Sequence, residues 1–154
     1  MIVSLGLLGV MVQAPQKNTP LNLIEKWWTV AKAPKMEDYK GKVLILHSYP
    51  SYCCGWDDSV KNVRAVLDKW PGKVAAVSFT YGTLSDNKKE FEEASHNLKI
   101  DWPFGVDPGE KFTEKLFPGE AVRYTYTLFD KNGKRVEAPV KQMEDLPKAV
   151  QKLL

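Results

Sequence analysis

The sequence predicts a single α/β domain in which helices cover both faces of a mixed central sheet. Two uninterrupted apolar runs, at residues 43–46 and 73–79, are typical of strands that are buried on both faces of a parallel sheet. Between them, residues 58–70 carry apolar side chains at helical spacing. An Asn132-Gly133 turn near the end of the chain indicates an antiparallel strand pair. Together these observations predict a three-layer α/β/α sandwich.

The composition agrees with one globular domain and excludes several other classes of protein. The 154 residues are 44% hydrophobic and 27% charged, which are ordinary values for a globular chain. The 22 basic and 19 acidic side chains give a net charge of +3 and are mixed along the sequence, so we expect no nucleic-acid partner. The two cysteines, Cys53 and Cys54, are adjacent and cannot form the disulfide framework of a small secreted protein.

The start of the chain has a different character. Residues 2–12 are apolar and uncharged. This run is shorter than the about 20 residues that span a bilayer, but it suits the apolar part of a secretory signal. We therefore expect residues 1–14 to be a signal peptide or an N-terminal anchor that tethers the protein to a membrane, the alternative being a buried strand or helix. Residues 15–20 predict a linker before the folded domain at residues 21–154, in an exported, periplasmic or otherwise extracytoplasmic protein.

In the first half of the domain, the sequence predicts one strand before the two apolar runs and one helix after each run. Residues 21–30 indicate a short helical turn followed by a strand. Pro71 and Gly72 end the helix predicted at residues 58–70. Residues 86–98 predict a second helix, for which Asp86 is the expected N-cap.

The second half predicts a hairpin and a closing helix. Residues 100–106 form an extended apolar segment, and residues 108–116 predict a short helix. Residues 124–129 and 134–136 are the expected strands of the hairpin, because the Asn-Gly turn lies between them. An apolar stripe predicts a last helix over residues 143–154. The expected order is strand, helix, strand, two helices, two strands and helix.

Three short motifs resemble those of a known family. Residues 41–46 (GKVLIL) match a Gly-Lys entry into an apolar strand, Ser51-Tyr52-Cys53 stands where the family has Ser-Trp-Cys, and residues 128–134 (LFDKNGK) match its Leu-Ile-Asp-x-x-Gly hairpin. The chain resembles the exported thioredoxin-like thiol–disulfide oxidoreductases, the TlpA-like and ResA-like proteins, over about residues 27–154. The resemblance implies a thioredoxin-like fold and redox activity in thiol–disulfide exchange with a protein or small-molecule thiol or disulfide.

Two departures from the family pattern concern the dithiol chemistry itself. The family motif is Cys-x-x-Cys, whereas this chain has Cys53-Cys54-Gly55-Trp56. The family also places a cis-proline before its hairpin strand, and the corresponding position here is Tyr124. An alternative function therefore stays open, in which the protein is a binding or assembly module that kept the fold and lost dithiol catalysis.

The predicted catalytic residues are Cys53 and Cys54. A cysteine at a helix N-terminus lies close to unpaired N–H groups and the positive end of the helix dipole, so we expect the pKa of the Cys53 thiol to fall below its usual value of about 8.5. Asp57 and Asp58 oppose this effect, because negative charge disfavours a thiolate. Cys54 is an unusual candidate for the resolving thiol, since adjacent Cα atoms lie about 3.8 Å apart and ordinary disulfides need about 4.4–6.8 Å.

Four further residues are predicted to contact the partner. Tyr52, Gly55, Trp56 and Tyr124 would surround the cysteines in the expected fold, with Gly55 keeping the turn open and Trp56 replacing the second motif cysteine. Aromatic side chains at a surface often anchor a binding site. The alternative is that these aromatic residues pack in the core.

Peroxidase and metal chemistry are weaker alternatives. The peroxiredoxin motif fails, because Leu46 and Pro50 stand at its proline and Thr/Ser positions, although Arg64 was a candidate to stabilise a thiolate. Copper binding would use Cys53, Cys54 and a histidine, but the Cys-x-x-x-Cys spacing of copper carriers is absent and His47, inside a strand, fits a structural role. We expect no metal and no cofactor, because the sequence has no Gly-rich phosphate loop and no paired catalytic carboxylates.

Overall fold

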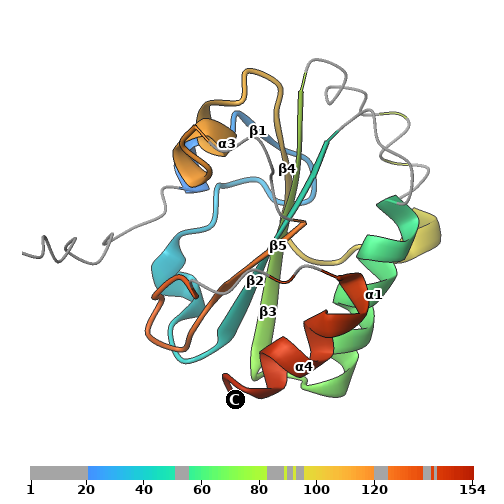
Figure 1. The fold of residues 1–154 in the computed structure, drawn as a ribbon. Coiled ribbons are helices and arrows are strands. Elements are labelled where there is room, and N and C mark those ends of the chain that lie inside the picture. The colour runs from blue at the N-terminus through green and yellow to red at the C-terminus, as the bar shows by residue number, and fades with distance from the viewer. Residues whose placement is uncertain are drawn as a thin grey trace, which may run out of the picture.

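A five-stranded mixed sheet forms the centre of the molecule (Figure 1). The computed structural model describes residues 21–50, 56–82, 89, 92, 96–119, 125–136, 140 and 142–154. In this part of the chain the strand order is β1-β4-β3-β2-β5. The central strands β2, β3 and β4 are parallel, whereas β1 and β5 pair antiparallel at the two edges. The strands are β1 (Lys26–Trp27), β2 (Val43–Pro50), β3 (Val74–Tyr81), β4 (Phe104–Asp107) and β5 (Tyr126–Phe129).

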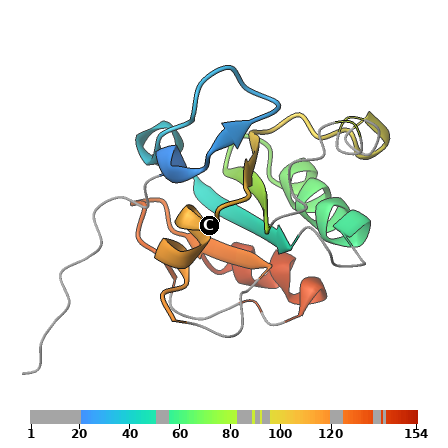
Figure 2. The same cartoon turned by 90° about the horizontal axis from the view of Figure 1, so that it is seen from above.

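Helices cover both faces of this sheet, which confirms the predicted three-layer α/β sandwich. On one face, α1 and α4 lie side by side, and on the other lies α3 with the turn η1 (Figures 1 and 2). The helices are α1 (Trp56–Lys69), α3 (Lys111–Leu116) and α4 (Leu146–Gln151), with three short 3₁₀ turns, η1 (Leu21–Leu23), η2 (Met36–Tyr39) and η3 (Met143–Asp145).

Strand β2 contributes to both halves of the core. Val43 and Ile45 pack on the side of α1, and Leu44 and Leu46 pack on the side of α3. Successive side chains of a strand point to opposite faces, so an unbroken apolar run suits a strand covered on both sides. The buried strand predicted at residues 43–46 is therefore confirmed and extends to Pro50.

The amphipathic pattern of α1 explains how this helix docks. Val60, Val63 and Val66 follow the predicted spacing and are fully buried against the sheet. Asp57 and Asp58 lie in the exposed first turn, where their negative charges interact favourably with the positive end of the helix dipole. The helix ends before Pro71, as the sequence predicts.

Strand β4 is a correction to the predicted order. Residues 100–106 are predicted to form an extended segment that is not one of the strands of the sheet. In the structure, Phe104–Asp107 is an interior strand between β1 and β3. Pro103 and Gly105 weaken the strand pattern of this short segment. Pairing with β1 and β3 stabilises the strand. Both partners are distant in the sequence, so the local pattern does not reveal this pairing.

The hairpin and the last helix are shorter than predicted. The turn is confirmed, because Gly133 has φ of 78° and Asp130 Oδ1 accepts hydrogen bonds from the amides of Asn132 and Lys134. The expected strand at residues 134–136 is reduced to a single bridge between Phe129 and Arg135.

At the end of the chain, η3 and α4 replace the continuous helix predicted over residues 143–154. Pro147 explains the division. A helix that began at residue 143 would need an amide hydrogen at Pro147, whereas a helix that begins at Leu146 does not.

Some predictions lie outside the described residues. These include the signal peptide or anchor at residues 1–14, the linker at residues 15–20 and most of the helix at residues 86–98. Among the described residues, no helix has the length and apolar character needed to cross a membrane.

Candidate functional site

The cysteines belong to the connection between β2 and α1. Strand β2 ends at Pro50 and α1 begins at Trp56. The five residues between them include Tyr52, Cys53, Cys54 and Gly55, which lie outside the described part of the chain. The connection therefore joins the carboxyl end of a central parallel strand to the amino end of a 14-residue helix.

Of the predicted site residues, only Trp56 is described, because Tyr124 is also outside the described part. Trp56 is half-buried at the first position of α1. Its ring meets the ring of Phe104 edge-on, with centroids 6.2 Å apart and an angle of 83°, while Trp28 stacks on the same phenylalanine at 6.1 Å. Edge-to-face and offset contacts of this kind are favourable for aromatic rings. The tryptophan at the fourth motif position is thus packed onto the sheet and is partly open to solvent.

A row of buried side chains crosses the sheet on the face that α1 covers. Strand register places His47 of β2 opposite Ser78 of β3 and opposite Tyr126 of β5. Ser78 in turn pairs with Phe104 of β4. All four residues are buried, and the rings of His47 and Tyr126 stack with centroids 5.5 Å apart.

His47 joins this row to α1 through two serine hydroxyls. Its Nε2 lies 2.9 Å from Ser59 Oγ, and its Nδ1 lies 3.0 Å from Ser78 Oγ. The Ser59 hydroxyl donates to the Trp56 carbonyl at 2.7 Å, and the Ser78 hydroxyl accepts from Trp102 Nε1–H at 2.8 Å. The chain of contacts therefore runs from the segment before β4, through β3 and β2, to the first turn of α1.

Only one arrangement of protons satisfies every group in this chain. The hydrogen of Ser59 is used on the Trp56 carbonyl, so His47 Nε2 must carry a hydrogen and donate it to Ser59 Oγ. Because Trp102 donates to Ser78 Oγ, the Ser78 hydroxyl hydrogen is free to reach Nδ1, which accepts it. The network thus assigns a neutral imidazole with its hydrogen on Nε2.

Burial favours the same neutral state. His47 is fully buried, and its desolvation lowers its pKa to about 3 from the usual 6.5. A second proton on Nδ1 would also leave the Ser78 hydroxyl hydrogen without its acceptor. The interpretation of His47 as a structural histidine with both nitrogens paired agrees with this geometry.

Ser59 is held at a second point. Its backbone carbonyl accepts a hydrogen bond from the Tyr126 hydroxyl at 3.0 Å. Burial raises the pKa of Tyr126 to about 12, although its hydrogen bond with Asn62 works in the opposite direction, so the hydroxyl keeps its proton. The first turn of α1 is consequently fixed to both β2 and β5 through one fully buried serine.

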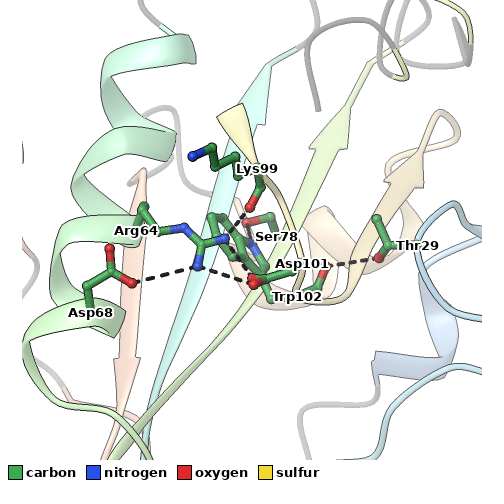
Figure 3. A network of polar contacts seen from close by, with 7 residues as sticks. All are labelled: Thr29, Arg64, Asp68, Ser78, Lys99, Asp101 and Trp102. Carbon is green, nitrogen blue, oxygen red and sulfur yellow. Dashed lines mark hydrogen bonds and ion pairs between the residues drawn. The ribbon is translucent and has the colours of Figure 1, made fainter. Parts of the chain in front are cut away.

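Arg64 closes the network on its outer side (Figure 3). Its guanidinium lies over the Trp102 ring, 4.8 Å from the centroid, and binds Asp101 at 2.6 Å and Asp68 at 3.8 Å. Figure 3 also shows the guanidinium directed to the Lys99 carbonyl. The guanidinium of Arg64 thus binds two carboxylates and covers an indole, and its candidate role as a thiolate stabiliser stays a prediction because the cysteines lie outside the described residues.

Sequence reasoning did not find the residues that surround His47. Ser78 lies between Val77 and Phe79, whereas Ser59 follows two aspartates, and both serines are fully buried. A polar side chain at a position predicted to be buried is the one available signal, since buried polar groups need partners. The partner of each serine is distant in the sequence, because His47 is 31 residues from Ser78 and 12 residues from Ser59.

The described residues contain no group of three His, Cys, Asp or Glu side chains arranged to hold a metal ion. His47 is fully buried, whereas His96 is exposed. The two histidines thus occupy different environments, and both nitrogens of His47 are engaged by serines.

Comparison with known proteins identifies the fold. No family model matches this sequence, and no curated protein matches it. Among solved structures, the thioredoxin domain of a thiol-disulfide oxidoreductase from Bacteroides vulgatus superposes with a TM-score of 0.64 at 16% identity, covering 90% of this chain and 96% of that one. A secreted disulfide oxidoreductase of Mycobacterium tuberculosis gives 0.61 at 14% identity, covering 85% and 97%. The exposed lipoprotein thioredoxin of Streptococcus pneumoniae gives 0.60 at 20% identity, covering 83% and 98%.

These similarities establish a thioredoxin-like fold for the chain. They extend over most of both partners in each comparison, so the whole domain and not a single motif is shared. Many of the similar structures are thiol–disulfide oxidoreductases, as the motif resemblance led us to expect.

Proposed function

We propose that the protein performs thiol–disulfide exchange outside the cytoplasm, with Cys53 as its nucleophile. The observation that carries this proposal is the position of Cys53, three residues before the start of α1 and just after a central strand of a thioredoxin-like sheet. Solved structures with the same fold include several proteins described as thiol–disulfide oxidoreductases, which supports the assignment.

The amino end of α1 gives Cys53 a physical route to reactivity. The first N–H groups of a helix have no partner within the helix, and they carry the positive end of its dipole. Both effects stabilise a nearby thiolate, which is the attacking form of cysteine. Asp57 and Asp58 reduce the effect, but both are exposed and Asp58 forms an ion pair with Lys61 at 3.4 Å.

The exchange needs two displacements. The Cys53 thiolate attacks one sulfur of a substrate disulfide, forms a mixed disulfide with it and releases the other sulfur as a thiolate. A second thiolate then attacks Cys53 Sγ, and the substrate leaves as a thiolate while a new disulfide forms. This second thiol is Cys54 or an external thiol, because Trp56 stands where the family has its second cysteine.

The neighbouring side chains are proposed to form the contact surface. We expect Tyr52, Gly55 and Tyr124 to flank the cysteines, and Trp56 is partly exposed at the start of α1. The substrate would be a protein or a small-molecule disulfide that approaches this end of the sheet. An extracytoplasmic location is supported by the secreted and exposed proteins among the similar structures, and by the apolar run at residues 2–12.

Turnover of a disulfide tests the function. Reduction of insulin or of DTNB is measured for the wild type, Cys53→Ser and Cys54→Ser. We expect Cys53→Ser to abolish turnover, and Cys54→Ser to trap the mixed disulfide if Cys54 is the resolving thiol. Equal rates for wild type and Cys53→Ser would refute the proposal and favour a non-catalytic binding module, for which the packing of Trp56 on Phe104 provides a structural rationale.

A further inference from the structure

The contacts of Ser59 distinguish the first turn of α1 from the rest of the helix. Its hydroxyl and its carbonyl are bound by side chains of two different strands, and its own hydroxyl hydrogen binds the carbonyl of Trp56. Farther along α1, Val60, Val63 and Val66 hold the helix by apolar contact, which has no direction, and the hydrogen bonds of Arg64 lie at its exposed edge. Hydrogen bonds, in contrast, fix distance and orientation.

We propose that His47 and Ser59 act as a positioning pair that fixes the amino end of α1 beside the reactive cysteine. The proposal rests on the proposed function, because it assigns the pair a role that acts through the first turn of α1. In this pair, neutral His47 donates from Nε2 to Ser59 Oγ, and Ser59 transmits the constraint to the carbonyl of Trp56.

The direction of the hydrogen bonds carries this inference. A serine that binds the carbonyl three residues earlier can slightly bend the helix, so the orientation of its hydroxyl affects the first turn. In this protein the hydroxyl cannot rotate away without leaving His47 Nε2–H unpaired in a fully buried place. Ser78 binds the other ring nitrogen of His47 and is itself bound by Trp102, so this contact is separate from the one that reaches α1.

Position matters for the thiol because the helix-end effect is short-ranged. The favourable field of a helix end is confined to its first turn. A first turn that is no longer anchored presents its N–H groups less regularly to the preceding residues. Loss of the positioning pair should therefore raise the thiolate pKa of Cys53 and slow its reaction at neutral pH.

The test compares two buried serines in a background with one thiol. Cys54→Ser leaves Cys53 as the single cysteine, and Ser59→Ala and Ser78→Ala are added separately. Both serines are fully buried and both bind His47, so each substitution removes one hydroxyl from the same network. Ser78→Ala leaves the contact between His47 and α1 in place and is the matched control.

The pH dependence of iodoacetamide labelling gives the thiolate pKa of Cys53 in each variant. We expect Ser59→Ala to slow labelling at pH 7 by about 3- to 10-fold and to shift the profile to higher pH, whereas Ser78→Ala leaves the profile unchanged. Equal profiles in all three proteins, or equal shifts in both serine variants, would overturn the proposal.

Two substitutions of His47 provide a rescue. The amide nitrogen of glutamine can occupy the place of Nε2 and donate to Ser59, whereas the shorter asparagine reaches only the place of Nδ1. His47→Gln should keep the labelling profile of the parent, and His47→Asn should resemble Ser59→Ala. A profile that shifts equally in both variants would contradict a role through Ser59.

A readout without the thiol separates this inference from the proposed function. Hydrogen exchange of the amides at residues 60–63, the first that bond to carbonyls within α1, should be faster in Ser59→Ala than in Ser78→Ala. If wild-type Cys53 has an ordinary pKa and no turnover, the proposed function fails, and the exchange rates alone then decide whether the pair positions α1. Equal exchange in the two variants would exclude the positioning role.

Discussion

The two faces of the sheet are built from alternate residues of the same strands, yet their chemistry differs. The face under α3 is mostly apolar, with Leu44 and Leu46 of β2 packed against Phe79 and Phe112, and its buried hydrogen bonds join two residues that are close in sequence, Asp107 and Thr113. The face under α1 has a comparable apolar centre but also carries the polar groups of His47, Ser78 and Ser59. Burial of polar groups is costly unless each one is paired, and here each one is.

The two faces differ in where their buried hydrogen bonds lie and in which elements these bonds join. On the α3 face, the buried hydrogen bonds of Asp107 tie the end of β4 to Thr113, six residues later in α3. The hydrogen-bonded row lies under the first turn of α1, next to the connection that carries the cysteines. The hydrogen bonds on the α3 face thus join one strand to the helix that follows it, whereas those on the α1 face tie the first turn of α1 to two different strands.

The largest expected effect is on stability, and it concerns the face under α3. Phe112→Ala removes a fully buried ring that meets Phe79 edge-on at 5.0 Å, so we expect the free energy of unfolding to fall by about 3–5 kcal/mol. Urea denaturation measures the loss. The labelling profile of Cys53 should stay unchanged while the protein is folded, and a shifted profile would show that the two faces are not independent.

The next effect is a pH dependence of the stability that His47 contributes to the α1 face. The folded-state pKa of His47 is about 3 and its ordinary value is 6.5, so the unfolded chain binds the proton first as pH falls. The stabilisation from neutral His47 is complete above pH 6.5 and is lost by about 1.4 kcal/mol per pH unit between pH 6.5 and 3. Among the described residues, the groups that face the ring are the hydroxyls of Ser59 and Ser78 and the rings of Tyr49 and Tyr126.

Urea denaturation at several pH values, on the wild type and His47→Gln, checks this expectation. Carboxylates titrate in the same range, so the difference between the two proteins is the informative quantity. Wild-type stability should fall relative to the variant by about 2 kcal/mol from pH 7 to pH 5. A constant difference would mean that His47 is not held neutral by the fold.

The smallest effect is expected at the exposed edge of the network. Arg64→Ala removes an ion pair with Asp101, whose side chain is 74% exposed, so we expect a loss of about 1 kcal/mol or less that decreases with added salt. Arg64→Met keeps an aliphatic stem over Trp102 and should lose less. Equal losses for the two variants would show that cover of the indole contributes nothing.

Much of the fold could be predicted because its signals are local. The strand at residues 43–46, the helix of Val60, Val63 and Val66 and the Asn-Gly turn each depend on the spacing of nearby residues. Strand β4 was missed as a strand because its short segment contains Gly105 and depends on pairing with β3 and β1.

The candidate site was only partly predictable. Cys53 and Trp56 were found because a motif is a local pattern, and the mismatch at Trp56 was visible at once. The partners of His47 were not found, since Ser59 and Ser78 come from different elements and no spacing links them.

The sequence by itself determined the class of fold, the order of most elements and the place of the two cysteines before α1, because periodicity and turn residues act over a few positions. The tertiary structure alone decided that β4 is an interior strand, that Arg64 binds Asp101 and that His47 is neutral and bound to Ser59. Strand register brings these groups together, and their proton positions follow from burial and from the number of donors and acceptors at each contact.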